Sequence, residues 1–298
     1  MRKLLLLVNP NAGQRRVNKL LTEVIGVFNE GGYEVTGFLT TGPGSGIRSV
    51  EDRAGAYDLV VCAGGDGTLN ETITGILRSG ADCPIGYIPC GSTIDFAATL
   101  KLSTDIVQAA RDIMLGKPEE HDLGRWGERY FTYIASFGAF TRVSYSTPQN
   151  LKNALGHLAY VLSGITELPQ IRSIPMRLEM DGEIVECKYL FGAVSNSTSV
   201  GGVITLDPHL VDLRDGKFEV ILVRLPKDPA ELAQCITALQ NHTYDSAAIT
   251  FRSESSLTVH QDPTLVWTLD GERAEGAEEI HIENLHRAIR LVRRQEEL

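Results

Sequence analysis

The stretch Asp58-Leu-Val-Val-Cys-Ala-Gly-Gly-Asp-Gly-Thr-Leu-Asn-Glu71 decides the fold. It begins as a continuous apolar run, which predicts a buried strand, and passes through a glycine-rich turn into a helix. The glycines lack a Cβ atom, so the backbone can turn sharply and bring N–H groups against a phosphate, and the helix adds the positive end of its dipole. A purely structural turn would also use glycine, but Asp66 and Asn70 place polar groups where a nucleotide would lie. The stretch therefore predicts a phosphate-binding loop.

The residues around this loop alternate between strand-like and helix-like patterns. Strands are predicted at 3–8, 33–39, 58–63 and 85–89, and helices at 17–28, 68–78 and 104–115. Alternation of this kind predicts a mostly parallel sheet covered by helices. A second polar turn, Asn9-Pro10-Asn11-Ala12-Gly13, follows the first strand, so both turns are expected at one edge of the sheet.

The pattern changes after about residue 122, where short strand-like segments follow one another. Asp181-Gly182 and Asp215-Gly216 lie between apolar runs and predict hairpin turns. A capped helical pattern at 147–165 is the exception. This part is predicted to be an antiparallel β domain carrying one helix, and a cleft between the two parts is the natural place for a site.

Composition excludes several classes of protein. With 298 residues, 43% hydrophobic, the chain is predicted to form two cored domains, and a formal charge of −10 argues against a general nucleic-acid binder. No apolar run approaches the roughly 18 to 20 residues that span a bilayer, and the opening apolar run is too short for a signal peptide. We therefore expect a cytoplasmic protein. The five cysteines form no CxxC pair and are read as ordinary buried thiols.

Two standard nucleotide-binding motifs are absent. The chain has no GxxxxGK[ST] motif, and its glycine-rich turns do not complete GxGxxG, which disfavours a P-loop protein and an ordinary Rossmann enzyme. A phosphate-binding loop without a P-loop lysine would draw positive charge from Mg²⁺ and backbone dipoles. Asp66, Asp95 and Asp122 are the candidate carboxylates that would organise catalytic Mg²⁺.

The order of motifs along the chain is that of a known family. NPNAG, GGDGTLNE, the segment from Pro89 to Ala97, Asp215-Gly216 and LDGE at 269–272 follow one another, and the chain resembles the soluble bacterial diacylglycerol kinases, whose catalytic domain is shared with sphingosine and ceramide kinases. The resemblance covers nearly the whole chain. It implies an α/β fold with an N-terminal nucleotide domain like those of phosphofructokinases and NAD kinases at 1–122, a C-terminal antiparallel β-sandwich domain at 123–285, and a return of 286–298 to the first domain.

The resemblance also implies which residues act. The family's ATP contacts fall on two loops and two isolated hydroxyls: Asn9, Pro10, Asn11, Ala12, Gly13, Gly64, Gly65, Asp66, Gly67, Thr68, Leu69, Asn70, Thr40 and Ser92. Glu272 takes the place of the base that accepts the proton of the substrate hydroxyl, and Asp122 matches a family position. A structural magnesium ion would be held by Asp215, with Asp212 and Lys217 as the flanking positions.

The chain departs from the family pattern at Ile94, where asparagine is usual, and at Arg214, where the family has the first Asp of an Asp-Asp-Gly turn. The resemblance implies an ATP- and Mg²⁺-dependent kinase that converts diacylglycerol to phosphatidic acid. The alternatives are an NAD kinase-like enzyme that phosphorylates a soluble nucleotide, and a catalytically weakened lipid- or nucleotide-binding regulator. A membrane lipid reached peripherally from the cytoplasmic side is the expected partner, with Arg15, Arg16, Lys19 and Arg48 as a basic docking face. The resemblance also implies a homodimer.

Overall fold

The computed structural model describes residues 1–91, 94–138, 173–200, 204–241, 243–244 and 246–294. The chain divides into two compact units. Unit 1 comprises residues 1–121 and 287–298, and unit 2 comprises residues 122–286. Two strands, β5 (Lys117–Trp126) and β17 (Glu279–Arg293), contribute residues to both units.

Unit 1 is built on a parallel sheet. Its strand order is β2 (Tyr33–Leu39), β1 (Arg2–Val8), β3 (Leu59–Gly64) and β4 (Ile85–Pro89), and the end of β17 adds a parallel partner to β4 through Leu291 and Ile85. All six residues of β3 and all five residues from Leu4 to Val8 are buried. Central parallel strands are covered on both faces, which is why they read as continuous apolar runs in the sequence.

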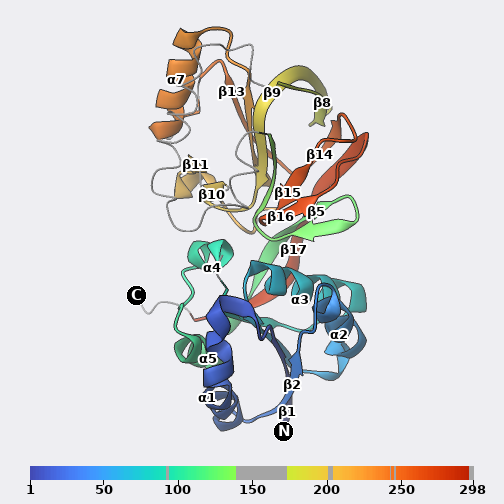
Figure 1. The fold of residues 1–298 in the computed structure, drawn as a ribbon, viewed down its shortest axis with the longest axis vertical. Helices are drawn as coiled ribbons and strands as arrows, with labels where there is room; N and C mark the ends of the chain where they lie inside the picture. The colour runs from blue at the N-terminus through green and yellow to red at the C-terminus, as the bar shows by residue number, and fades with distance from the viewer. Residues whose placement is uncertain (92–93, 139–172, 201–203, 242, 245, 295–298) are drawn as a thin grey trace. The chain divides into compact units, whose positions relative to one another are not determined.

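Helices cover both faces of this sheet (Figure 1). The helices α1 (Arg16–Glu30) and α5 (Ile106–Leu115) pack together on one face, and α2 (Ser45–Arg53) and α3 (Asp66–Ser79) pack together on the other. The short helix α4 (Asp95–Thr99) lies between β4 and α5 along the chain. The helix α5 begins two residues later than its pattern predicts, because the Asp105 carboxylate caps it by accepting from the Gln108 N–H at 2.8 Å.

Unit 2 is an antiparallel β structure. Its strands are β6 (Arg129–Phe131), β7 (Ile134–Gly138), β8 (Ile174–Met180), β9 (Glu183–Ser195), β10 (Ser199–Val200), β11 (Ile204–Thr205), β12 (Phe218–Arg224), β13 (Ile249–Glu254), β14 (Ser256–His260), β15 (Trp267–Leu269) and β16 (Glu272–Ala274), with the adjoining parts of β5 and β17. The long strand β9 pairs with β8 over its first half and with β7 and β12 over its second. The two-domain fold class predicted from the sequence, parallel α/β followed by antiparallel β, is confirmed.

Large aromatic side chains fill the core of unit 2. The Trp267 ring lies 4.8 Å from that of Phe137 and 6.1 Å from that of Trp126, measured between ring centroids, in tilted arrangements. Tilted contacts at these separations are favourable for aromatic pairs. This cluster holds β15, and with it the β15–β16 hairpin, against β7.

The helices and turns of unit 2 differ in part from those predicted. The predicted helix at 147–165 lies outside the described residues. The sequence analysis missed a helix, α7 (Pro229–Gln240), although Asp228 caps it through the Glu231 N–H and proline occupies its first position. The expectation that Asp215-Gly216 is a hairpin turn is wrong, because β12 pairs with β9 and β13 and not with a strand just before the turn. The Asp181-Gly182 hairpin between β8 and β9 is confirmed.

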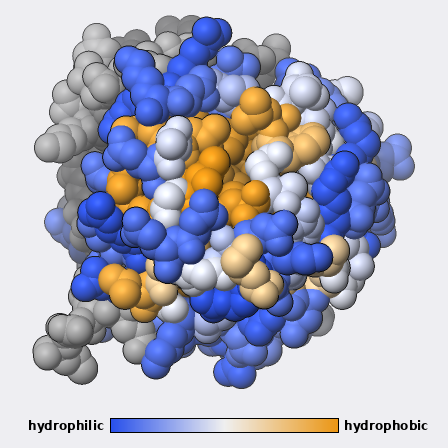
Figure 2. All heavy atoms as spheres, turned by 90° about the horizontal axis from the view of Figure 1, so that it is seen from below, coloured by the Kyte–Doolittle hydropathy of each residue, from blue (hydrophilic) through white to orange (hydrophobic). Residues whose placement is uncertain are grey.

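Figure 2 shows one face on which apolar side chains gather at the centre and hydrophilic side chains surround them. Among the described residues, the large apolar side chains with substantial exposure are Met1, Leu39, Leu115, Ile184 and Leu210. Within the described part of the chain, no helix is both long and apolar enough to span a bilayer.

Thiol reactivity tests this fold. Burial raises the pKa of Cys62 to about 12 and that of Cys83, Cys90 and Cys235 to about 11, whereas Cys187 is partly exposed. A chromogenic disulfide reagent at pH 8 should therefore react rapidly with one thiol per folded chain and with all five after unfolding. Cys187→Ser should remove the rapid phase. A second rapid thiol in the folded protein would contradict the packing described.

Candidate functional site

Three loops meet at the carboxyl edge of the sheet in unit 1. The N–H groups of Cys90 and Gly91, after β4, donate to the Gly64 carbonyl at 2.8 and 3.1 Å. Gly13, in the loop after β1, has a φ of +49°, and a Cβ atom placed there would lie 1.6 Å from the Cys90 carbonyl oxygen. Only glycine permits this backbone approach. The loops after β1, β3 and β4 are therefore packed into one cluster, which we call the loop cluster.

The first loop of this cluster is tied directly to the glycine turn. The Asn9 N–H donates to the Ala63 carbonyl at 2.9 Å, and the Asn9 side-chain amide donates to Thr68 Oγ1 at 3.3 Å. The Asn9 Oδ1 in turn accepts from the Asn11 N–H at 3.0 Å. The Thr40 N–H donates to the Val8 carbonyl at 2.9 Å, which places Thr40 beside the same loop.

The structure thus brings together most of the residues expected to contact ATP. The residues placed at this edge are Asn9, Pro10, Asn11, Ala12, Gly13, Thr40, Gly64, Gly65, Asp66, Gly67, Thr68, Leu69 and Asn70. Ser92 lies outside the described residues. The Leu69 side chain is fully buried, so only its backbone is available to a ligand. The glycine turn leads directly into α3, where the N–H groups of Thr68 and Leu69 donate to the Gly65 carbonyl and the positive end of the helix dipole suits an anion.

Asp66 links the glycine turn to α4. It is 3% exposed, its Oδ1 accepts from the Tyr87 hydroxyl at 3.2 Å, and its Oδ2 accepts from the Asp95 N–H at 2.9 Å. Burial raises the pKa of Asp95, the first residue of α4. Two of the candidate magnesium organisers are therefore brought together, and Tyr87 is a third member that the sequence analysis missed because nothing in the pattern of β4 marks its hydroxyl.

Glu71 also has a role that the sequence analysis did not assign. Its two carboxylate oxygens accept from the N–H groups of Gly44 and Gly46, at 2.6 and 2.9 Å. These donors belong to the first turn of α2 and the residue before it, close to Thr40 in the chain. Glu71 therefore fixes the loop after β2 to α3, and its presence within GGDGTLNE was the available signal.

Ile94 stands at the N-cap of α4. The Ala98 N–H donates to the Ile94 carbonyl at 3.1 Å, but the apolar side chain supplies no capping hydrogen bond. Asparagine is among the best N-cap residues and isoleucine among the poorest. The departure from the family pattern therefore has a local structural consequence, a helix start without a side-chain cap.

In unit 2, Asp270 anchors the turn that carries Glu272. Its buried carboxylate accepts from the N–H groups of Thr132, Tyr133 and Ile134 at 2.6, 3.0 and 3.1 Å, and from the Thr132 hydroxyl at 2.9 Å. Burial raises the pKa of Asp270, and these hydrogen bonds oppose the shift. The anchored turn holds Glu272 at the start of β16, where its carboxylate is mostly exposed and lies 3.9 Å from the Arg129 guanidinium.

Asp122, the first residue of unit 2, holds a second turn. Its Oδ2 accepts from the Gly216 N–H at 2.6 Å, and its Oδ1 lies 3.1 Å from His286 Nδ1. Its own N–H donates to the Leu213 carbonyl at 3.0 Å. The contacts in the structure thus give Asp122 the task of fixing the Asp215-Gly216 turn, and a role with catalytic magnesium stays a prediction.

The structural magnesium site expected at Asp212, Asp215 and Lys217 stays a prediction. Asp212 and Asp215 are exposed. Burial of the Glu219 carboxyl is the main cause that raises its pKa to about 8, and the negative charges of Asp215 and Asp212 add to this shift. Glu219 Oε2 has no hydrogen-bond partner among the described residues. The described residues contain no group of three or more His, Cys, Asp or Glu side chains arranged to hold a metal. The Asp215 carboxylate and the backbone carbonyls at Asp212 and Lys217 are oxygen donors of the kind that Mg²⁺ prefers, but the Lys217 carbonyl already accepts from the Asn284 side-chain amide at 2.9 Å.

Comparison with known proteins agrees with this arrangement. Residues 3–126 match the diacylglycerol kinase catalytic domain, and residues 134–293 match the YegS C-terminal NAD kinase beta sandwich-like domain. The diacylglycerol kinase of Bacillus subtilis (strain 168) is 31% identical over 274 residues, which are 91% of this chain and 90% of the relative. The chain belongs to the diacylglycerol kinase family. Its members include the diacylglycerol kinase of Staphylococcus aureus (strain MRSA252), 31% identical over 90% of this chain and 85% of that relative.

The fold of this diacylglycerol kinase family member also has solved counterparts. A crystal structure of a diacylglycerol kinase from Bacillus anthracis str. Sterne superposes with a TM-score of 0.74 at 21% identity, over 98% of this chain and 97% of that one. Because the catalytic domain and the named relatives agree, the chain is a kinase.

The close approach of loops predicts the effect of an alanine at Gly13. Gly80→Ala, at φ +65° in open space, should cost only the left-handed backbone term of about 1 to 2 kcal/mol. Gly13→Ala adds a collision with the Cys90 carbonyl and should be clearly more destabilising in urea unfolding, with loss of nucleotide binding in any folded fraction. Equal effects of the two substitutions would show that the loops are not packed as described.

Restoring a cap at Ile94 is a second test. Ile94→Asn should stabilise α4 by about 1 kcal/mol, because asparagine at the N-cap can accept from a backbone N–H of the first turn and isoleucine cannot. Urea unfolding followed by circular dichroism measures this gain. The same variant should raise turnover if the missing cap limits activity, and unchanged turnover would remove the basis for a weakened regulator.

Proposed function

We propose that this kinase transfers the γ-phosphate of ATP to the free hydroxyl of diacylglycerol and so produces phosphatidic acid. The observation that supports the nucleotide half is the loop cluster, in which the loops after β1, β3 and β4 and the start of α3 converge at one sheet edge. Named relatives about 31% identical over nine-tenths of the chain support diacylglycerol as the acceptor.

The proposed chemistry assigns each residue a task. Backbone N–H groups of the loop cluster bind the phosphates of ATP, and Mg²⁺, when bound near Asp66 and Asp95, neutralises charge on the phosphoryl oxygens. The acceptor hydroxyl attacks the γ-phosphorus, its proton passes to the Glu272 carboxylate, and the bond to ADP breaks. Asp270 orients Glu272 through the anchored turn, and mostly exposed Glu272 can meet a substrate hydroxyl.

The acceptor lies in a membrane, so the kinase must reach a lipid surface. Arg15, Arg16 and Lys19 are exposed near the start of α1 and offer a basic face to anionic headgroups. We propose that the kinase binds the membrane surface peripherally through this basic face.

An NAD kinase-like reaction is the second candidate. It is favoured by one observation, that residues 134–293 match a domain described as NAD kinase beta sandwich-like. The GGDGTLNE and LDGE motifs and the named relatives favour the lipid. Parallel assays with mixed micelles of diacylglycerol and with NAD separate the two, and phosphorylation of NAD alone would overturn our proposal.

Replacing the proposed base tests the mechanism. Glu272→Ala should lower kcat by about 10²- to 10⁴-fold, the usual contribution of a general base, and leave ATP affinity nearly unchanged. Asp66→Ala should reduce both turnover and ATP affinity, because it releases Tyr87 and Asp95. Glu275→Ala, an exposed carboxylate just after the same hairpin that pairs with Arg273, is the matched control and should keep activity. Equal loss of ATP affinity in the Glu272 variant would mean that the roles are misassigned.

A further inference from the structure

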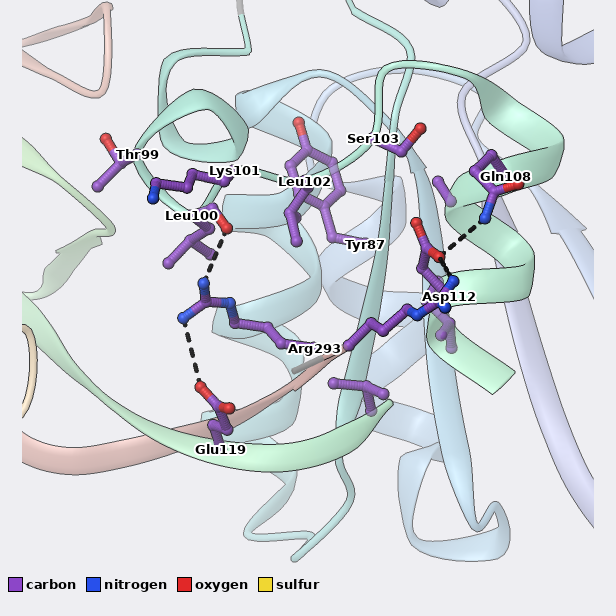
Figure 3. Close-up of a pocket in the computed structure, with 14 residues that line it drawn as sticks. Tyr87, Thr99, Leu100, Lys101, Leu102, Ser103, Gln108, Asp112, Glu119 and Arg293 are labelled. Atoms are coloured by element: carbon purple, nitrogen blue, oxygen red, sulfur yellow. Dashed lines mark hydrogen bonds and ion pairs between the residues drawn. The ribbon is translucent and has the colours of Figure 1, made fainter. Parts of the chain in front are cut away.

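A cavity opens within unit 1, and none of the residues expected to contact ATP lines it. Its volume is 770 Å³, within the range of about 300 to 1,000 Å³ that small-molecule sites occupy. Its walls come from α5, from β5, from the end of β17 and from the segment that joins α4 to α5 (Figure 3).

Among the charged side chains that line this cavity, one cation forms no ion pair with a described residue. Arg293 donates to Glu119 Oε2 at 3.3 Å and to the Leu100 carbonyl at 2.9 Å. Arg294 donates to Asp112 Oδ1 at 3.2 Å. The remaining basic lining residue, Lys101, is exposed and forms no ion pair with any described residue. The cavity therefore carries one uncompensated positive charge.

The backbone of Lys101 is a second, independent observation. Its φ is +54°, its N–H donates to the Ala98 carbonyl at 3.1 Å, and the next N–H, of Leu102, donates to the Ala97 carbonyl at 2.9 Å. This pair of bonds is a Schellman motif, in which the left-handed position favours glycine. Lysine is present where glycine would be the more stable residue, a feature that the backbone of Lys101 shares with Arg15, Asp181, Asp270 and Arg287.

The rest of the lining is amphipathic. Apolar side chains of Leu100, Leu102, Ile113 and Val292 share the cavity with the hydroxyl groups of Thr99 and Ser103. We propose that this cavity binds an amphipathic anion, a molecule with one phosphomonoester or similar anionic group on an apolar body, whose charge pairs with Lys101.

The cavity is also connected to the ATP site. Tyr87 lines the cavity, and its hydroxyl donates to Asp66 Oδ1 at 3.2 Å. A ligand that packs against Tyr87 therefore contacts the residue whose hydroxyl donates to Asp66, at the start of α3. Occupancy of the cavity and nucleotide affinity should be coupled, and the coupling must be reciprocal.

Calorimetric titration with octyl phosphate tests the proposal without any phosphoryl transfer, so its outcome is separate from that of the proposed function. Octyl phosphate should bind at least about tenfold more tightly than octanol, which lacks the charge, and than inorganic phosphate, which lacks the apolar body. Lys101→Gly should remove the advantage over octanol while raising the melting temperature, because glycine suits the left-handed position.

Asp181→Gly is the matched control, since Asp181 also has a positive φ, of 47°, but lies in unit 2 outside the cavity lining. It should leave octyl phosphate binding unchanged. Ser103→Trp, which places a bulky ring in the cavity, should weaken binding of both octyl compounds. Increasing ATP should change octyl phosphate affinity by a finite factor that reaches a limit.

Three results would overturn the proposal: octyl phosphate binding no tighter than octanol, full binding in the Lys101→Gly variant, or unlimited competition by ATP. Unlimited competition would place the anion in the loop cluster. Preference for vesicles of phosphatidic acid over soluble octyl phosphate would identify the source as a lipid headgroup, and the reverse preference would identify a free metabolite.

Discussion

The backbone contact between Gly13 and the Cys90 carbonyl is the constraint on which unit 1 depends. A similar steric constraint acts at Gly64, where a Cβ atom would lie 2.3 Å from the Thr68 hydroxyl oxygen. The two glycines allow the loop after β1 to lie against the loop after β4, and the glycine turn to pass directly into α3. Because three strand ends and one helix start then converge, main-chain N–H groups can do the work that a P-loop protein gives partly to a lysine.

Carboxylates fix the remaining loops, and they do so through backbone N–H groups. Asp66 accepts from Asp95, Glu71 from Gly44 and Gly46, Asp122 from Gly216, and Asp270 from three successive residues. Hydrogen bonds to an ionised acceptor are the stronger kind, and a buried carboxylate that lost its donors would be costly. The acidic residues of the motifs are therefore needed to hold loops in place, whatever further contacts they make with substrate.

The sequence predicted the parallel part of the fold well because strands buried on both faces are continuous apolar runs, as at Leu59–Gly64. It also placed the two polar turns, after β1 and β3, at one edge, since parallel strands end together. It could not reveal contacts between residues far apart in the chain, such as Tyr87 with Asp66 or Asp122 with Gly216. The Asp215-Gly216 turn misled because the same dipeptide that closes hairpins also serves a turn fixed by a distant carboxylate.

The helix α4 shows why such local departures matter together. Ile94 leaves its first turn without a side-chain cap, and Lys101 occupies the left-handed position after its last turn. A five-residue helix with unfavourable residues at both ends has almost no intrinsic stability, so its position must come from tertiary contacts. Phe96 and Ala97 are buried, and the Asp95 N–H is held by Asp66. The position of this short helix, which joins the loop cluster to the cavity, therefore depends on these buried contacts and on the hydrogen bond from Asp95 to Asp66.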